Sequence, residues 1–286
     1  MKGGGSSLRV LVVVHVFYPR LYPELAAAVR NLGAADLVVT FVDEAAVTVA
    51  RRDFPSATFL RCENRGYDVY PFLKALQSVD LAGYDLVVKL HTKRDVEFPH
   101  RIVIGHTWLN GSRWRSHLLA FVRTPGAWRR TVARFRDPRV GMVADRHVIF
   151  GRRDALTDAH RRSFDAARAT LNGEWGLRVP ADATFVGGTM FAARAEALRP
   201  FAVRRFAPEM FAVSRGHESE TLAHVLERML GLAVCGQGYR LVAFRGSPAL
   251  RRFGYALLRL FVRSRWSRRR HIVRVCGITV WRRKLA

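Results

Sequence analysis

NRGYDVYPFL at residues 64–73 and YDLVVKLHTK at residues 84–93 decide the fold of this chain. The first stretch places a glycine among polar side chains, between an expected strand at 57–61 and an expected helix at 71–79. The second is an apolar strand, expected at 85–90, that ends in Lys, His and Thr. Ligands of open α/β sheets bind at the carboxyl ends of strands. We therefore look for a functional site where these two strands end.

Strands and helices alternate along the first part of the chain. A continuous apolar run predicts a buried strand at 8–14, and further strands are predicted at 37–42, at 57–61 and, as another apolar run, at 85–90. Helices are predicted between them at 24–32, 45–52 and 71–79. Such alternation implies crossover connections and a mostly parallel sheet. Further on we expect helices at 128–135, 155–171 and 220–230, a strand at 140–144 and a sheet segment at 185–193. Without a repeat or linker, residues 1–245 are predicted to form one α/β domain, followed by a tail at 246–286.

Composition gives a folded and strongly basic protein. The chain has 286 residues, 49% of them hydrophobic, and a formal net charge of +25. From Arg245 to the end there are 13 basic side chains and no Asp or Glu. Such a tail suits anionic lipid headgroups or nucleic acid. Because arginine far outnumbers lysine along the whole chain, coding bias is an alternative explanation for part of the charge.

Cysteine usage and the chain ends predict a cytoplasmic protein. Cys62, Cys235 and Cys276 form no metal-ligand spacing, and their odd number argues against a disulfide framework. Residues 1–7 lack the charged and apolar regions of an export signal. The apolar run at 253–262 is interrupted by Arg259 and is shorter than the roughly 20 residues that span a bilayer. We therefore expect no transmembrane helix.

The strand that ends at Lys93 carries three candidate donor-binding residues. Side chains alternate along a strand, so Lys89, His91 and Lys93 share one face. Two cations and an imidazole in that position suit a diphosphate. The alternative is that both lysines are solvated residues at the end of a strand.

The turn at 64–68 carries four more candidates. Gly66 permits a close approach of backbone to a ligand, Arg65 can form two hydrogen bonds to phosphate, and Asp68 can accept from a sugar hydroxyl, with Asn64 beside them. The alternative is an ordinary strand-to-helix turn in which Asp68 caps the helix. Asp43, at the end of the second strand, is a candidate contact for a nucleotide base.

Two later segments are candidates for the same site. Gly187, Gly188 and Thr189 could lie against a bound sugar or diphosphate, or could form a bulged strand of the core. Arg194 could pair with the diphosphate or be a surface residue.

The helix at 220–230 presents a polar face. Leu222, Val225, Leu226 and Met229 form its apolar stripe. Glu220, His224 and Glu227 lie opposite, where a carboxylate could act as general base. The alternative is a solvated face on which His224 bridges two glutamates.

The tail is predicted to form an amphipathic helix at 248–266. Leu250, Phe253, Leu257 and Leu260 or Phe261 fall on one face, and Arg252, Arg259 and Arg263 on the other. With Trp266 and the arginines at 268–270, this pattern is typical of a helix at a membrane interface. A helix docked on the domain is the alternative.

The two opening stretches resemble the rhamnan synthesis protein F family of bacterial polysaccharide glycosyltransferases. HVFYP at 15–19, GGTMF at 187–191 with Arg194, and TLAH at 221–224 with Glu227 and Arg228 match in the same order, and WR at 114–115 matches more weakly. The resemblance covers residues 8–231. It implies a glycosyltransferase-A-like fold, a Rossmann-like sheet with helices on both faces, and a donor site that includes His15.

The resemblance also implies the chemistry. A sugar, L-rhamnose from dTDP-rhamnose in the simplest case, would pass from its nucleotide to a cell-surface polysaccharide or lipid-linked precursor. We expect inverting displacement, in which a carboxylate deprotonates the acceptor and cations stabilise the departing diphosphate. The expected location is the inner face of the cell membrane.

Two departures, one from the glycosyltransferase-A fold and one from the family pattern, leave roles open. The Asp-x-Asp motif that usually holds Mg²⁺ or Mn²⁺ after the fourth strand is missing, so fixed positive charge is expected instead, although Asp95 or His91 could still ligate a metal. Ser219 stands where the family usually carries an acid, so Glu220, Glu218 and Glu209 remain candidate bases. Two other hypotheses are a basic nucleic-acid-binding protein, for which no motif is present, and a catalytically inactive membrane-associated scaffold.

Overall fold

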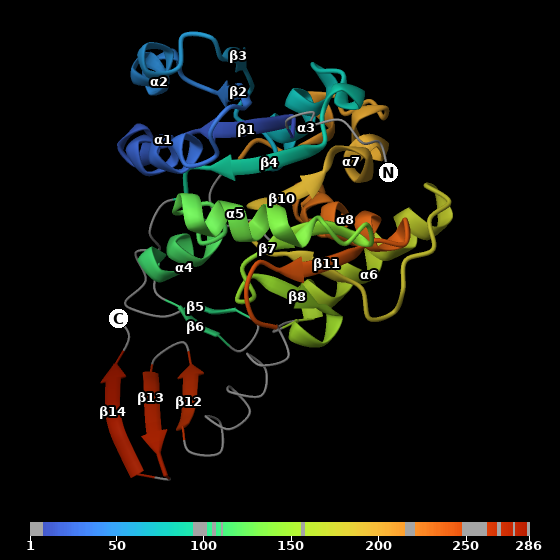
Figure 1. The fold of residues 1–286 in the computed structure, drawn as a ribbon. Helices are drawn as coiled ribbons and strands as arrows, with labels where there is room; N and C mark the ends of the chain where they lie inside the picture. The colour runs from blue at the N-terminus through green and yellow to red at the C-terminus, as the bar shows by residue number, and fades with distance from the viewer. Residues whose placement is uncertain are drawn as a thin grey trace. The chain divides into compact units, whose positions relative to one another are not determined.

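A computed structural model describes residues 8–93, 102–104, 107–109, 111–155, 158–214, 221–247, 262–267, 270–276 and 278–284. The chain divides into two compact units, Met1–Arg245 and Gly246–Ala286. Figure 1 shows the fold of each unit.

The larger unit is built on a seven-stranded sheet with the order β11-β7-β10-β4-β1-β2-β3. The strands are β1 (Val10–Val16), β2 (Asp36–Phe41), β3 (Thr58–Arg61), β4 (Leu86–His91), β7 (Val140–Ala144), β10 (Phe191–Arg194) and β11 (Arg240–Ala243). Neighbours pair in parallel except at β10, which is antiparallel to both β4 and β7. The carboxyl ends of β1 to β4, β7 and β11 therefore share one edge of the sheet.

Helices cover both faces of this sheet (Figure 1). The helices are α1 (Tyr22–Arg30), α2 (Thr48–Asp53), α3 (Val69–Gln77), α4 (Gly111–Leu118), α5 (Pro125–Arg134), α6 (Asp158–Gly173), α7 (Ala195–Ala202) and α8 (Leu222–Gly236). Right-handed crossovers put α1 and α2 on one face and α3, which returns from β3 to β4, on the other. There α3, α7 and α8 contact one another. The predicted α/β class is confirmed, and the arrangement is consistent with a Rossmann-like fold.

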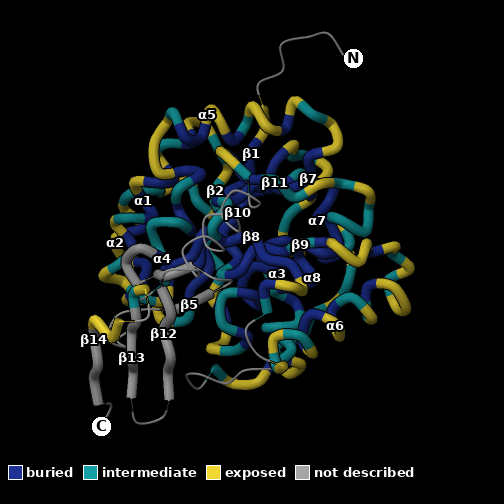
Figure 2. The backbone as a smooth tube through the Cα atoms, turned by 90° about the horizontal axis from the view of Figure 1, so that it is seen from below, coloured by how far each residue is buried: buried dark blue, intermediate teal, exposed yellow. Residues whose placement is uncertain are grey.

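The core lies on both faces of the central strands. Every residue of β1 and of β4 is buried, and in Figure 2 the strands of the sheet run through the buried interior. Valine and leucine dominate these strands because a strand covered on both faces has no solvated side for polar residues. Lys89 and His91 of β4 are therefore buried polar residues in an apolar strand.

Two two-stranded sheets accompany the large sheet. Strands β5 (Ile102–Ile104) and β6 (Thr107–Leu109) pair antiparallel, as do β8 (Ile149–Gly151) and β9 (Thr184–Val186). The sheet segment predicted at 185–193 is therefore two strands of different sheets. Gly188 has φ +75° and Thr189 has φ +49°, so the backbone turns between β9 and β10 instead of staying extended.

Helix α8 continues past residue 230, where it was predicted to end. Gly231 lies inside the helix, which runs to Gly236. A Cβ on Gly231 would lie 2.5 Å from Phe185 Cα and 2.9 Å from the carbonyl oxygen of Thr184. Gly231 is thus a point of close approach between α8 and β9. Of the predicted apolar stripe, Leu226 and Met229 are buried.

The smaller unit contains an antiparallel sheet. Strands β12 (Val262–Ser267), β13 (Arg270–Val275) and β14 (Ile278–Lys284) pair in chain order. The helix predicted at 248–266 is wrong for residues 262–266, which lie in β12 and pair with β13. β-Branched and aromatic residues such as Val262 and Trp266 favour strands. The rest of that prediction lies outside the described residues.

The structure also bears on the predictions for the cysteines and for membrane-spanning helices. Cys62, Cys235 and Cys276 are free, which confirms that no disulfide framework is present. Among the helices of the described residues, none has the length and apolar character to cross a bilayer.

Candidate functional site

Three polar side chains from distant parts of the chain meet at the carboxyl edge of the sheet. Asp68 ends the turn between β3 and α3, Lys89 belongs to β4, and Thr189 belongs to the turn before β10. Antiparallel pairing sets Phe191 of β10 opposite Lys89, which brings the preceding turn over this lysine. The topology thus joins two of the turns that the sequence singled out.

These residues form a closed hydrogen-bond network, here called the Asp68 network (Asp68, Lys89 and Thr189). Lys89 Nζ lies 2.5 Å from Asp68 Oδ2 and donates to Thr189 Oγ1 at 2.6 Å. The Thr189 hydroxyl donates to the same carboxylate oxygen. The Lys89 side chain is 1% exposed and that of Asp68 is 16% exposed. Asp68 is therefore the member of the network that solvent or a ligand can reach.

Charge balance holds this network together. Burial opposes ionisation of Asp68, but the charges of Lys89 and Lys93 and the Lys89 hydrogen bond hold the pKa of its carboxyl well below the usual range. Burial also lowers the pKa of Lys89. The carboxylate and the ammonium group compensate each other, as buried charges require. The interpretation of Lys89 as a solvated strand-end residue is therefore wrong.

Two buried histidines flank the network on β1 and β4. His15 and His91 are register partners in the parallel pair of these strands. His15 Nδ1 lies 3.0 Å from Thr40 Oγ1, and burial lowers the pKa of His15 to about 4. Burial lowers the pKa of His91 well below its usual range, and its Nδ1 lies 3.5 Å from Asp68 Oδ2. Neither ring nitrogen of His91 has a hydrogen-bond partner, so this imidazole is a neutral polar group of the site.

The turn at 64–68 is shaped by the segment that lies over it. Gly66 has φ +61°, and a Cβ there would lie 2.6 Å from Phe211 Cδ1. Arg65 Nη1 donates to the Phe211 carbonyl at 2.8 Å, and Arg65 Nε donates to Glu63 at 2.9 Å. Tyr67, with φ +53°, donates its amide to Ser214 Oγ at 3.1 Å. Arg65 therefore fastens the 211–214 segment to the turn.

Helix α8 contributes the polar face that the sequence predicted. Glu227 Oε1 accepts a 2.6 Å hydrogen bond from the amide of Gly188, next to Thr189. His224 Nδ1 lies 2.8 Å from Thr221 Oγ1, and its ring meets the Tyr67 ring edge-on with centroids 5.6 Å apart. Burial lowers the pKa of His224. Glu227 thus contacts the turn at 187–189, and His224 contacts the turn at 64–68.

A protein-family model matches the part of the chain that contains this site. The model of the family described as "Rhamnan synthesis protein F" matches residues 2–239. This chain belongs to the rhamnan synthesis protein F family. The match contains every residue of the Asp68 network, and it confirms the resemblance seen in the sequence.

Two curated relatives of this rhamnan synthesis protein F chain are named "Uncharacterized protein WxcX", from two strains of Xanthomonas campestris pv. campestris. Each is 31% identical to it over 242 residues. The aligned region is 80% of this chain and 32% of each relative. The chain thus spans about a third of the length of the curated relatives that it matches.

Several predicted site residues of this family member lie apart from the network or outside the described residues. Asp43 is exposed and accepts from the amide of Ala45 at 3.1 Å, which makes it the cap of a short 3-10 helix, η2 (Glu44–Ala46). Asn64 is exposed, and its backbone carbonyl accepts a hydrogen bond from the Ser214 amide. Glu209 is exposed in η5 (Pro208–Met210). Glu218, Glu220 and Asp95 lie outside the described residues.

Lys93 is a half-buried cation that lies just after the end of β4. Its charge lowers the pKa values of Asp68 and His91, so it lies within electrostatic reach of the network. Arg115, from the weaker family block, donates to the Lys93 carbonyl at 3.3 Å and to Glu24 at 2.5 Å. The role of Lys93 toward a diphosphate stays a prediction.

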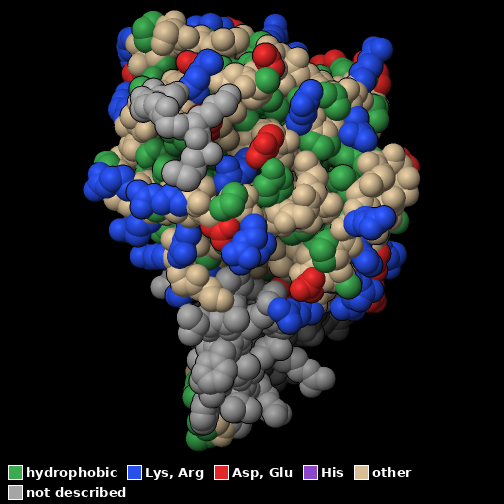
Figure 3. Space-filling model, turned by 45° about the vertical axis from the view of Figure 1, so that its right-hand side comes forward, with side chains coloured by type: hydrophobic (Ala, Val, Ile, Leu, Met, Phe, Trp, Pro, Cys, Tyr) green, Lys and Arg blue, Asp and Glu red, His purple; other side chains and the backbone are tan. Residues whose placement is uncertain are grey.

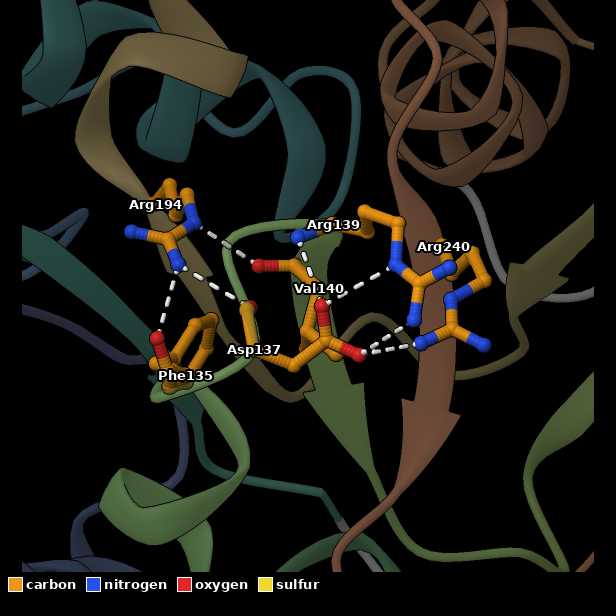
Figure 4. Close-up of polar contacts among 6 residues, drawn as sticks. All are labelled: Phe135, Asp137, Arg139, Val140, Arg194 and Arg240. Carbon is orange, nitrogen blue, oxygen red and sulfur yellow. Dashed lines mark hydrogen bonds and ion pairs between the residues drawn. The ribbon is translucent and has the colours of Figure 1, made fainter.

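Arg194 is a structural residue in this fold. Its guanidinium donates to the carbonyl oxygens of Val140 and Phe135, both at 2.8 Å, and of Asp137 at 3.2 Å (Figure 4). In the same view Asp137 pairs with Arg139 and Arg240. The interpretation of Arg194 as a surface residue is wrong, because its Nε and Nη2 donate to backbone carbonyls of the chain itself.

The metal ligation considered for Asp95 or His91 stays a prediction, since Asp95 lies outside the described residues, but the Asp68 network beside His91 does not suit a metal ion. Asp68 is the carboxylate of the network, and a buried ammonium group already lies 2.5 Å from it. A cation placed there would meet the positive charge of Lys89 at close range. Among the described residues, a different group has suitable ligands: His117, Asp145 and His147. Asp145 and His147 directly follow the predicted strand at 140–144, so a polar strand end was visible, but no local spacing linked it to His117.

Proposed function

We propose that this chain is a glycosyltransferase that takes a sugar from a nucleotide-sugar donor and passes it to a polysaccharide or lipid-linked glycan. The observation that carries the proposal is membership of the rhamnan synthesis protein F family over residues 2–239. The family description supports L-rhamnose as the sugar, and dTDP-rhamnose is the donor that we propose to test first.

The order of the central sheet supports a glycosyltransferase-A-like fold. Four parallel strands, β3-β2-β1-β4, are followed by the antiparallel strand β10 and then by β7 and β11. In this proposal the donor lies at the carboxyl ends of the parallel strands, where polar groups gather in an otherwise apolar sheet. The turns at 64–68 and 187–189 form its walls.

The proposed reaction is a single inverting displacement. The acceptor hydroxyl oxygen forms a bond to the anomeric carbon while the bond from that carbon to the diphosphate oxygen breaks. The nucleoside diphosphate leaves with the electron pair, and a carboxylate takes the hydroxyl proton. Lys93 stabilises the charge on the leaving group. Glu220 and Glu218 remain the proposed bases.

Within the described residues, the other groups have positioning roles in this proposal. Asp68 accepts from a hydroxyl of the donor, while Lys89 and Thr189 hold its carboxylate in place. Glu227 is engaged by the Gly188 amide and by Arg228, at 3.3 Å, so we assign it to holding the turn rather than to proton transfer.

The test is calorimetric titration of the full chain with a panel of nucleotide sugars, with and without EDTA, followed by an assay for released nucleoside diphosphate. We expect one nucleotide sugar to bind and to release its nucleotide when an acceptor is present. Binding without release would favour an inactive scaffold. Failure of every nucleotide sugar to bind would refute the proposal.

We also propose that the smaller unit binds an anionic membrane surface. Strands β12, β13 and β14 contain seven basic residues and no acidic one: Arg263, Arg265, Arg270, Arg274, Arg282, Arg283 and Lys284. By contrast, Figure 3 shows Lys and Arg spread over the described part of one face, with Asp and Glu among them. Sedimentation with anionic vesicles, weaker at high salt, is expected. Salt-sensitive DNA binding without vesicle binding would favour nucleic acid instead.

A further inference from the structure

We propose that His117, Asp145 and His147 form a site for one divalent transition-metal ion. His117 belongs to α4, while Asp145 and His147 follow the end of β7. Because β7 is antiparallel to β10, which is antiparallel to β4, Asp145 lies on the same edge of the sheet as the Asp68 network. The proposal does not depend on the identity of a donor sugar.

The three side chains converge on one point. His147 Nδ1 lies 2.6 Å from Asp145 Oδ1, and His117 Nδ1 lies 3.2 Å from the same oxygen. The two imidazole rings have centroids 4.1 Å apart, and all three ligand atoms lie within 4.8 Å of one another. Tetrahedral zinc bonds of about 2.0–2.2 Å separate ligand atoms by roughly 3.3 Å. Small side-chain movements therefore suffice to admit an ion.

The ligand types select the class of metal. Two imidazole nitrogens and one carboxylate oxygen suit Zn²⁺, Fe²⁺, Ni²⁺ or Cu²⁺. Mg²⁺ and Ca²⁺ prefer sites made entirely of oxygen ligands. The proposed site therefore differs in chemistry from an Asp-x-Asp magnesium or manganese site.

The burial of the cluster allows entry and leaves coordination positions open. The side chain of Asp145 is 2% exposed, whereas those of His117 and His147 are 22% and 19% exposed. A buried carboxylate between two partly exposed imidazoles gives an ion a path from solvent. Three protein ligands also leave a fourth position for water, as in open zinc sites.

The surrounding fold fixes these ligands before any ion binds. The His147 amide donates to Asp145 Oδ1 at 2.8 Å, and the Val148 amide donates to the Asp145 carbonyl at 3.1 Å, so both ligands lie on one tight turn. Such hydrogen bonds orient ligating carboxylates. On α4, Trp114 and Leu118 are buried, so the helix that carries His117 is anchored in the core. The ion would therefore link α4 to the end of β7.

Titration of the chelator-treated full chain with ZnCl₂ tests the proposal. We expect a Zn²⁺ site that His117→Ala and His147→Ala each weaken at least tenfold, and no binding of Mg²⁺ at this site. His160→Ala is the matched control, since it removes an exposed histidine of α6 and should leave Zn²⁺ affinity unchanged. Circular dichroism checks that each variant is folded.

A second measurement keeps the proposal open to refutation if a variant misfolds. Zn²⁺ should raise the melting temperature of the parent chain, because a ligand that binds only the native state stabilises it. Absence of this rise would refute the site. Zn²⁺ affinities that are equal in the parent and in folded His117→Ala and His147→Ala would also refute it, since the three side chains would then form only a hydrogen-bonded cluster.

Discussion

Lys89 Nζ and Asp68 Oδ2 lie 2.5 Å apart, although Lys89 belongs to β4 and Asp68 to the turn after β3, at the far side of β1 and β2 in the sheet. The pair joins the start of α3 to the middle strand of the sheet. Lys89 Nζ also lies 5.3 Å from the centroid of the Phe72 ring in α3. One buried cation thus holds both the turn and the helix that follows it.

Lys89→Met should lower the free energy of unfolding by about 3–5 kcal/mol, because it leaves the Asp68 carboxylate buried without its partner. Chemical denaturation measures the change. Lys74→Met is the matched control, since Lys74 Nζ donates to the Arg61 carbonyl at the surface and its loss should cost under about 1 kcal/mol. Equal losses in the two variants would contradict the assignment of Lys89 as a compensating charge.

His15 should make the fold sensitive to acid. Its pKa is about 4 in the folded chain, against 6.5 when exposed, mainly because of burial, with Asp68 raising and Lys89 lowering it. The unfolded chain therefore binds more protons between these values, and stability falls as the pH drops from 6.5 to 4. The loss is roughly 3 kcal/mol. Unfolding free energies measured from pH 7 to 4 should fall less steeply in His15→Asn; identical slopes would contradict this prediction.

Arg194→Ala should lower the free energy of unfolding by about 2–3 kcal/mol, because three backbone carbonyls lose a charged donor. Thermal and chemical unfolding measure the effect. Arg139→Ala removes an arginine from the same group, but one whose side chain is 72% exposed, and should change stability by less than about 0.5 kcal/mol. If Arg194 instead bound a diphosphate, its loss would weaken nucleotide affinity with little change in stability.

Lys93→Ala and Arg65→Ala should differ in kind. Removing Lys93 should weaken nucleoside diphosphate binding by about 1–3 kcal/mol and leave stability unchanged, since this half-buried cation ends the strand. Removing Arg65 should also destabilise the chain, because it detaches the Phe211 carbonyl. Titration and denaturation of both variants separate the two roles. Unaltered nucleotide affinity in Lys93→Ala would remove this lysine from the proposed site.

The parallel strands β1 to β4 could be predicted because apolar residues dominate their sequences. The expected strands at 8–14, 37–42, 57–61 and 85–90 correspond to β1 (Val10–Val16), β2 (Asp36–Phe41), β3 (Thr58–Arg61) and β4 (Leu86–His91). The signal is strongest in β1 and β4, which are buried along their whole length, and weakest in the edge strand β3, which has no fully buried residue. Alternation with helices then gave the parallel pairing. The helix predicted at 248–266 was wrong at 262–266 because a short window of apolar residues and arginines, such as Val262 to Trp266, fits a helical stripe as well as a strand.

The candidate site was predictable as a set of residues but not as a network. Local sequence indicated polar strand ends at 64–68, 89–93 and 187–189. It could not show that Asp68 and Lys89 neutralise each other, because that contact depends on how the chain returns from β3 to β4 past β2 and β1. Nor could it reveal that Arg194 donates hydrogen bonds to three backbone carbonyls or that His117 contacts Asp145, since these partners lie tens of residues apart in the chain.

Gly231 makes the position of the site sensitive to a residue that takes no part in it. Its missing side chain sets how near α8 comes to β9, and Glu227, one helical turn earlier, holds the Gly188 amide at 2.6 Å. A methyl group at 231 would meet backbone atoms, which cannot swing aside as a flexible side chain can. The absence of a side chain at residue 231 therefore sets the spacing between α8 and the turn at 187–189. A substitution at residue 231 would alter the geometry of the site although this residue contacts no part of the Asp68 network.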